Sequence, residues 1–195
     1  MEKPTINFML DIETLDVTPN AHILEIALVK FDIVSGAIDE TATLHHKFGL
    51  KPQGGVISPD TLDWWVNGGH DVEKQRDYFI TLARSDVAAD LRESLSKIDL
   101  LLNRMRLVGN VRVWSATLFD SDVLNAAFKR LNETTSILIP FWETRDCRAL
   151  RDIGDLYADL MRDKSIQAAT HNAYEDCVRQ IKYITEVTRY IESVR

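Results

Sequence analysis

Two carboxylates stand two residues apart at the end of an apolar run near the start of the chain. Asp11 and Glu13 flank Ile12, and the run before them, residues 6–12, is rich in strand-forming side chains. In a β-strand, residues i and i+2 point to the same side, so both carboxylates could face one point and bind a hard divalent cation. The alternative for this spacing alone is a pair of solvated acids at a strand end.

The chain contains its own control for that spacing. Asp71 and Glu73 repeat the pattern, but they lie in a segment whose residues predict a helix. Two helical residues that are two positions apart point about 200° away from each other. The spacing therefore indicates a shared site only where the backbone is a strand.

Three further residues stand where an acid or an imidazole could join such a site. Asp120 follows a predicted strand and precedes an amphipathic helix, where it could equally be an N-cap. His171 lies in a predicted loop, and Asp176 follows five residues later in the first turn of the last predicted helix. Taken alone, a helix-start aspartate usually reflects the helix dipole, and a loop histidine is usually a surface group.

Apolar periodicity predicts the elements that would position these residues. Strands are expected at 6–12, 23–31 and 38–48 as an antiparallel meander, then at 111–114 and 137–139. Two short helices are expected within 58–79, and longer ones at 87–105, 121–131, 146–160 and 173–193. This order predicts an α/β fold: a mixed five-stranded sheet, its first three strands antiparallel, flanked by helices. Residues 1–195 are expected to form a single domain.

The motifs taken together resemble those of a known family. In this order and on these elements, they are similar to the DEDDh branch of the proofreading-type 3′→5′ exonucleases, which have the ribonuclease H-like fold. The first motif is Asp11-Ile12-Glu13-Thr14, the second is Phe119-Asp120, and the third is His171 with Asp176. The resemblance spans residues 6–184, and the chain is most similar to the short phage and bacterial exonucleases.

The resemblance implies a reaction and its cofactors. The motif carboxylates would bind two divalent cations, Mg²⁺ or Mn²⁺, which suit ligand sets made of oxygen. His171 would be the general base that takes a proton from water, a role that fits an imidazole with an ordinary pKa of about 6.5. A nucleoside 5′-monophosphate would leave a nucleic acid that has a free 3′ end. The residues expected to act as metal ligands are Asp11, Glu13, Asp120 and Asp176.

The resemblance also implies contacts to the terminal nucleotide. Thr14 would donate a hydrogen bond, and Leu15 would wedge against the base, although Leu15 could simply pack in the core. Trp64 and Trp65 point in different directions on a helix, so one should be buried and one exposed. We assign Trp65 to substrate binding. Glu25 stands where relatives often carry an acid, but it could be a buried partner for a polar neighbour.

Charge and missing motifs narrow the function classes. A formal net charge of −7 argues against nonspecific coating of duplex nucleic acid, although it does not exclude an enzyme that grips a strand end. A small-molecule α/β enzyme is disfavoured because the chain has neither a Gly-rich phosphate loop nor a G-x-S-x-G elbow. The His171/Asp176 motif disfavours a ribonuclease H-like endonuclease. A catalytically inactive nucleic-acid-binding module is disfavoured because all five expected catalytic residues are present.

Substrate, location and assembly are less constrained by the sequence. DNA is favoured by the likeness to phage exonucleases, with RNA as the alternative, since discrimination depends on contacts to the 2′-hydroxyl. Without a long apolar run or a signal-peptide pattern, a soluble cytoplasmic protein without a membrane partner is expected. Cys147 and Cys177 form no C-x-x-C pair and are expected to be reduced, buried thiols. The oligomeric state is left open, with a homodimer as one candidate.

Overall fold

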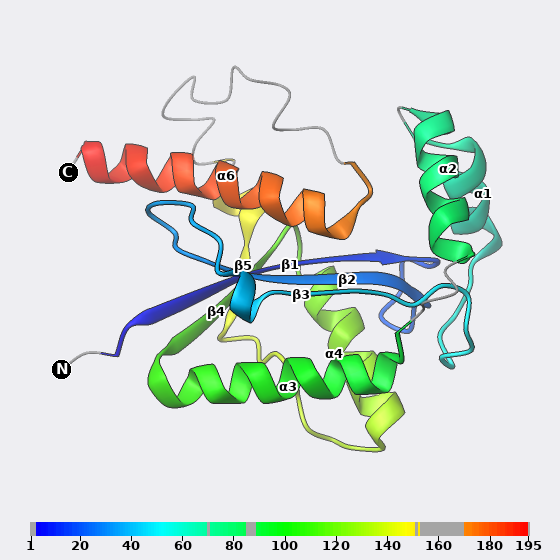
Figure 1. Cartoon of the computed structure of the whole chain (residues 1–195), viewed down its shortest axis with the longest axis horizontal. Coiled ribbons are helices and arrows are strands. Elements are labelled where there is room, and N and C mark those ends of the chain that lie inside the picture. Colours follow the sequence, from blue (N-terminus) through cyan, green and yellow to red (C-terminus); the bar gives the residue numbers. More distant parts are fainter. Residues whose placement is uncertain (1–2, 70, 85–88, 151, 153–169, 195) are drawn as a thin grey trace.

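A mixed five-stranded sheet forms the centre of the molecule. The computed structural model describes residues 3–69, 71–84, 89–150, 152 and 170–194. The strand order is β3-β2-β1-β4-β5 (Figure 1). β1, β2 and β3 pair antiparallel, whereas β4 pairs parallel with β1 and β5 pairs parallel with β4, which confirms the predicted sheet. The strands are β1 (Thr5–Thr14), β2 (Ile23–Phe31), β3 (Leu44–Lys47), β4 (Asn110–Ser115) and β5 (Thr144–Asp146).

Helices cover both faces of this sheet and one of its ends. In Figure 1, α6 lies above the sheet, α3 and α4 lie below it, and the α1–α2 pair stands at the right. Their bounds are α1 (Pro59–Asn67), α2 (Val72–Ala83), α3 (Leu91–Val108), α4 (Phe119–Asn132) and α6 (Ala173–Ser193). In the part of the chain that the structure describes, no helix is both long and apolar enough to cross a membrane.

The alternation of side chains along β1 decides which face receives the carboxylates. Phe8, Leu10 and Ile12 pack into the core between the sheet and helices α3 and α4. Met9 packs into the core between the sheet and α6. Because side chains alternate along a strand, Asp11 and Glu13 continue the Met9 row. The strand therefore presents both carboxylates to the α6 side of the sheet.

The last helix matches its prediction. α6 covers Ala173–Ser193, and its apolar face is buried against the sheet through Cys177, Ile181, Ile184 and Val187. The Asn172 side chain caps its start by accepting a hydrogen bond from the Glu175 N–H at 3.0 Å. Cys177 lies on this inward face, and both cysteines are free and buried, as expected.

The predicted fifth strand at 137–139 is wrong, and β5 lies instead at Thr144–Asp146. Leu138 and Ile139 are buried in the core, so the apolar run correctly indicated burial. However, the backbone of Ile139 bonds to the side chain of Asn125, at 2.9 Å through its N–H and 2.8 Å through its carbonyl. A side chain thus satisfies this backbone in place of a neighbouring strand.

Other boundaries differ for local reasons. The third strand is shorter than expected because Asp39 caps a one-turn 3-10 helix at Glu40–Ala42. α3 begins only at Leu91 because Asp90 is its N-cap, and residues 85–88 lie outside the described chain. α4 begins at Phe119, two residues earlier than predicted. Of the helix expected at 146–160, Asp146 instead ends β5, residues 147–150 and 152 are helical, and the others lie outside the described residues.

Candidate metal centre and its surroundings

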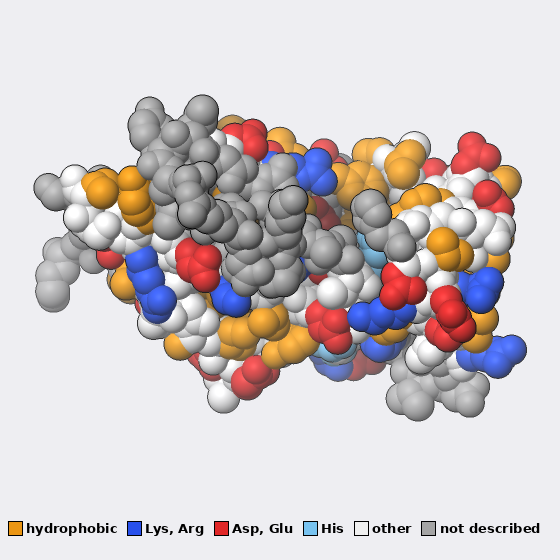
Figure 2. All heavy atoms as spheres, turned by 90° about the horizontal axis from the view of Figure 1, so that it is seen from above, with side chains coloured by type: hydrophobic (Ala, Val, Ile, Leu, Met, Phe, Trp, Pro, Cys, Tyr) orange, Lys and Arg blue, Asp and Glu red, His pale blue; other side chains and the backbone are white. Residues whose placement is uncertain are grey.

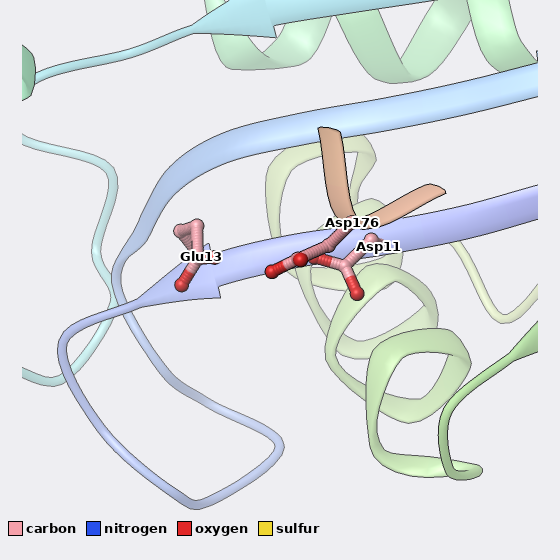
Figure 3. Close-up of side chains that lie close together, drawn as sticks. All are labelled: Asp11, Glu13 and Asp176. Atoms are coloured by element: carbon pink, nitrogen blue, oxygen red, sulfur yellow. The ribbon is translucent and has the colours of Figure 1, made fainter. Parts of the chain in front are cut away.

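Three carboxylates meet where the end of β1 faces the start of α6. Asp11 and Glu13 come from β1 and Asp176 from α6 (Figure 3), and one oxygen of each lies within 4.8 Å of the other two. All three side chains are buried. Buried charges of one sign repel each other and lack water, so they require a counter-charge. Arg179 contacts Asp176 at 3.1 Å, but a set of oxygen ligands like this also fits a hard divalent cation.

The environment of the cluster disfavours the charged forms of Asp11 and Glu13. Burial raises the pKa of Asp11 well above its ordinary value, and Asp120, Glu13 and Asp176 raise it further. The pKa of Glu13 is also raised, first by burial and then by repulsion from Asp176 and other neighbouring acids. A bound divalent cation would stabilise the ionised forms that this environment opposes.

Gln180 is a partner of the cluster that our sequence reasoning missed. Its amide Nε2 donates a hydrogen bond to Asp11 Oδ1 at 2.9 Å. This residue lies on α6 four positions after Asp176, on the face that packs against the sheet. A buried polar residue on an otherwise apolar helix face is the signal that could have identified it. The bond fixes the orientation of the Asp11 carboxylate.

Asp176 also organises the loop that carries His171. The backbone N–H groups of Thr170 and His171 donate to its carboxylate at 2.9 and 3.1 Å. His171 adopts a left-handed conformation with a φ of 55°, which is uncommon for a residue other than glycine. The five-residue spacing between the histidine and the aspartate therefore has a physical basis: the loop turns back onto the first turn of α6.

The His171 ring lies beside the tryptophan pair of α1. Its centroid is 4.9 Å from the Trp64 ring at an interplanar angle of 85°, and 6.0 Å from the Trp65 ring at 74°. The three-carboxylate cluster does not include this ring. The loop before α6 thus packs the His171 ring against the Trp64 and Trp65 rings of α1.

Asp120 lies next to the cluster but outside its tight group. It is buried in the first turn of α4, whose N-cap position is Leu118, so the N-cap alternative is excluded. Burial raises the pKa of Asp120 to about 7, while the backbone N–H groups of Asp120, Ile12 and Thr117 oppose that shift. The negative charge of Asp120 raises the pKa of Asp11, which indicates that the two carboxylates lie close together.

The residues assigned to the terminal nucleotide divide between core and surface. Trp65 is 1% exposed, and its indole N–H donates to the Thr14 carbonyl at 2.9 Å, so this ring packs in the core and its substrate contact stays a prediction. Trp64 is 39% exposed and is the more accessible ring of the pair. Leu15 is fully buried against Trp65 and Phe79, which favours the packing alternative. The hydroxyl of Thr14 bonds to the Asp16 carbonyl, and its substrate contact stays a prediction.

The surface on the α6 side carries charges of both signs. Figure 2 shows acidic and basic side chains interspersed on this face, with the described basic residues not gathered into one broad patch. Such a surface lacks the electrostatic footprint of a protein that coats duplex nucleic acid.

Comparisons with known proteins agree with this geometry. The model of a family described as a 3′-5′ exoribonuclease Rv2179c-like domain matches residues 6–188. An exodeoxyribonuclease of Enterobacteria phage T4 is 22% identical over 213 residues, an alignment that covers 94% of this chain and 89% of the phage protein.

Solved structures show the same fold. S. pombe Pop2p, in a form with Mg²⁺ and Mn²⁺ bound, superposes with a TM-score of 0.58 at 18% identity, over 97% of this chain and 85% of that one. The nuclease domain of 3′hExo, a DEDDh family member bound to rAMP, gives 0.54 at 12% identity, over 96% and 92%. The solved structures confirm the predicted ribonuclease H-like fold, and the family model confirms the resemblance to 3′→5′ exonucleases.

Proposed function

Because the chain belongs to the Rv2179c-like family of 3′-5′ exoribonuclease domains and is a 3′→5′ exonuclease, we propose that it shortens DNA from the 3′ end by metal-dependent hydrolysis. The product would be a nucleoside 5′-monophosphate, and residues 1–195 would act as one domain. The three-carboxylate cluster of Asp11, Glu13 and Asp176 carries this proposal. RNA is the second candidate substrate, because the matching family is described as exoribonucleases whereas the T4 relative is an exodeoxyribonuclease.

The carboxylates are proposed to hold two divalent ions, Mg²⁺ or Mn²⁺. When bound, such ions supply Lewis-acid activation of the phosphodiester and of the attacking water. The chain's own contribution is to fix the ligand oxygens: Gln180 orients Asp11, and the N–H groups of the loop before α6 orient Asp176. The proposed ligands are Asp11, Glu13, Asp120 and Asp176.

His171 is proposed as the general base. It takes one proton from the water that attacks phosphorus, the bond from phosphorus to the 3′ oxygen breaks, and that oxygen is protonated by solvent. The edge-on contact with Trp64 restricts the orientation of the imidazole. The exposed face of Trp64 could stack on the terminal base, an interaction worth about 1–3 kcal/mol per base.

The test uses the full chain with matched oligonucleotides labelled at one end or the other. With Mg²⁺ or Mn²⁺, a 5′-labelled strand should give a ladder that shortens one nucleotide at a time, and excess chelator should stop it. Early release of a 5′ label as a mononucleotide would show the wrong polarity, and internal cuts from the start would favour an endonuclease. DNA and RNA of the same sequence, single and double stranded, are compared side by side to decide the substrate class.

A further inference from the structure

Another buried acid lies beside the candidate metal centre. Glu25 on β2 is the cross-strand partner of Glu13 on β1, and its side chain is fully buried. Burial favours the neutral form of this acid, but hydrogen bonds from His45, Tyr78 and the Ala173 N–H outweigh it and lower the pKa of Glu25. Unlike Asp11 and Glu13, Glu25 is thus a carboxylate whose charge the protein itself stabilises.

Its partners come from three different elements. The Nε2 atom of His45, on β3, lies 2.6 Å from Oε1, and the Lys47 ammonium lies 3.8 Å from the same oxygen. The Tyr78 hydroxyl, on α2, donates at 2.8 Å from both oxygens. The backbone N–H of Ala173, the first residue of α6, donates to Oε2 at 3.2 Å. One side chain on β2 therefore ties β3, α2 and α6 together.

The start of α6 has a second link to the same network. His45, besides contacting Glu25, stacks on the Tyr174 ring with centroids 5.4 Å apart and planes 23° apart. The Tyr174 hydroxyl in turn donates to Glu40 at 3.0 Å. The first two residues of α6 are thus both held through the Glu25–His45 pair, directly at Ala173 and indirectly at Tyr174.

We propose that Glu25 is a positioning residue for the exonuclease reaction, an inference that rests on the proposed function. Its carboxylate fixes where the first turn of α6 docks on the sheet. That turn and the loop before it carry Asp176 and His171, so the docking point sets their placement relative to Asp11 and Glu13. A misplacement of about 1 Å among reacting groups can cost about 100-fold in rate, which makes such a tie matter to the chemistry.

Glutamine at this position would keep the shape and remove part of the function. A carboxylate offers two acceptor oxygens, whereas an amide offers one acceptor and one NH₂ donor. The Ala173 N–H donates to Oε2, the Lys47 ammonium and His45 Nε2 lie at Oε1, and the Tyr78 hydroxyl reaches both oxygens. Neither the backbone N–H nor the ammonium can become an acceptor. Glu25→Gln therefore places a donor against a donor or breaks one of the ties, without opening a cavity.

The test compares Glu25→Gln with a matched control, Glu143→Gln. Glu143 is also a buried glutamate that accepts from a charged side chain, with Arg106 Nη2 at 2.7 Å, but it holds the turn before β5. At saturating metal and a temperature where both variants are folded, kcat of Glu25→Gln should fall about 10–100-fold with KM for the oligonucleotide unchanged. Glu143→Gln should lower the unfolding temperature and leave kcat as in the wild type. Equal kcat in the two folded variants would overturn the proposal.

Amide hydrogen exchange separates this proposal from the function on which it rests. If the wild type cuts no substrate, the proposed function fails, and exchange of residues 170–176 then decides the role of Glu25. Faster exchange there in Glu25→Gln than in Glu143→Gln supports the tie, and equal exchange rejects it. Should Glu25→Gln not fold, Tyr78→Phe takes its place, because it removes one donor and keeps the ring; unchanged kcat and unchanged exchange in that variant would reject the proposal.

Discussion

The same D-x-E pattern occurs twice in this chain with opposite outcomes. Asp11 and Glu13 lie on β1, where alternation points both carboxylates into one buried cluster. Asp71 is the N-cap of α2, and Glu73 stands in that helix's first turn, and both are exposed. At a helix start each acid interacts separately with the backbone or the dipole. The backbone under the pattern therefore decides between a shared binding centre and two independent capping interactions.

The largest contrast between the two copies should appear in nuclease activity. Asp11→Ala should lower kcat at least about 10⁴-fold and abolish binding of Mn²⁺, because metal activation is worth several kcal/mol and each 1.36 kcal/mol is tenfold. Asp71→Ala, which removes the first acid of the second D-x-E pattern, should retain wild-type activity. Single-turnover degradation and calorimetric Mn²⁺ titration measure both effects. Comparable losses in the two variants would break the comparison.

His171 sharpens the comparison by separating proton transfer from metal binding. His171→Ala should bind Mn²⁺ as the wild type does and lose about 10²–10⁴ in rate, the usual contribution of a general base. His46→Ala is the control, since that ring contacts Ser94 at 2.7 Å on the side of the sheet that faces α3. Loss of metal binding in His171→Ala would contradict the role assigned to it.

The tryptophan pair on α1 offers a second comparison, because two identical adjacent residues differ in burial. Trp64→Ala should raise KM about tenfold, within the range for loss of one stacked base, and leave the unfolding temperature nearly unchanged. Trp65→Ala should cost about 3–5 kcal/mol of stability because it empties a core position. Steady-state kinetics and thermal unfolding distinguish the two. A higher KM for a folded Trp65→Ala alone would support the predicted substrate role of Trp65 and reject that of Trp64.

Stability should respond to the two D-x-E copies with opposite signs. In metal-free protein at neutral pH, Asp11→Asn should raise the melting temperature, because it removes a buried charge that burial and three acids oppose and still accepts from Gln180. Asp71→Ala should lower it by about 2–4 °C, which corresponds to about 1 kcal/mol for a lost cap. Differential scanning calorimetry in chelator measures both. A lower melting temperature for Asp11→Asn would contradict the repulsion argument.

The pH dependence of the metal-free protein should follow Asp120. Its folded pKa, about 7, is raised above that of the unfolded chain, so its contribution to stability is complete below about pH 4 and is lost as pH rises to about 7. The melting temperature of the wild type relative to Asp120→Asn should fall over this interval and level off above it. Mn²⁺ at pH 7 should restore part of the loss by binding only the folded state. A flat difference between pH 4 and 7 would refute this.

The sequence predicted the parts of the site that depend on local periodicity. The alternation along β1 placed Asp11 and Glu13 on one face, and the apolar stripe of residues 173–193 placed Asp176 at a helix start. The fifth strand was wrong because a three-residue strand is defined by its neighbour and not by its own pattern. Which tryptophan is buried depends on how α1 docks, and adjacent helical residues give no preference.

The partners of Gln180 and Glu25 lay beyond sequence reasoning for another reason, although the sequence had indicated Glu25 as a candidate buried partner for a polar neighbour. Their bonds to the site join residues that are 169 and 148 positions apart in the chain. A single sequence carries no pattern that reports such pairs, whereas strand and helix periods repeat within a few residues. Only the three-dimensional arrangement brings Gln180 against Asp11 and Glu25 against the start of α6.

That long separation has a consequence for the nascent chain. β1 and β2 are neighbours in sequence and can pair early, but the candidate centre also needs α6, which is translated last among the described elements. A ribosome adds about 5–20 residues per second, so β1 emerges many seconds before Asp176 exists. Until then the growing polypeptide carries two of the candidate ligands, Asp11 and Glu13, without Asp176. The proposed hydrolytic activity therefore cannot arise before α6 has been translated and has packed against the sheet.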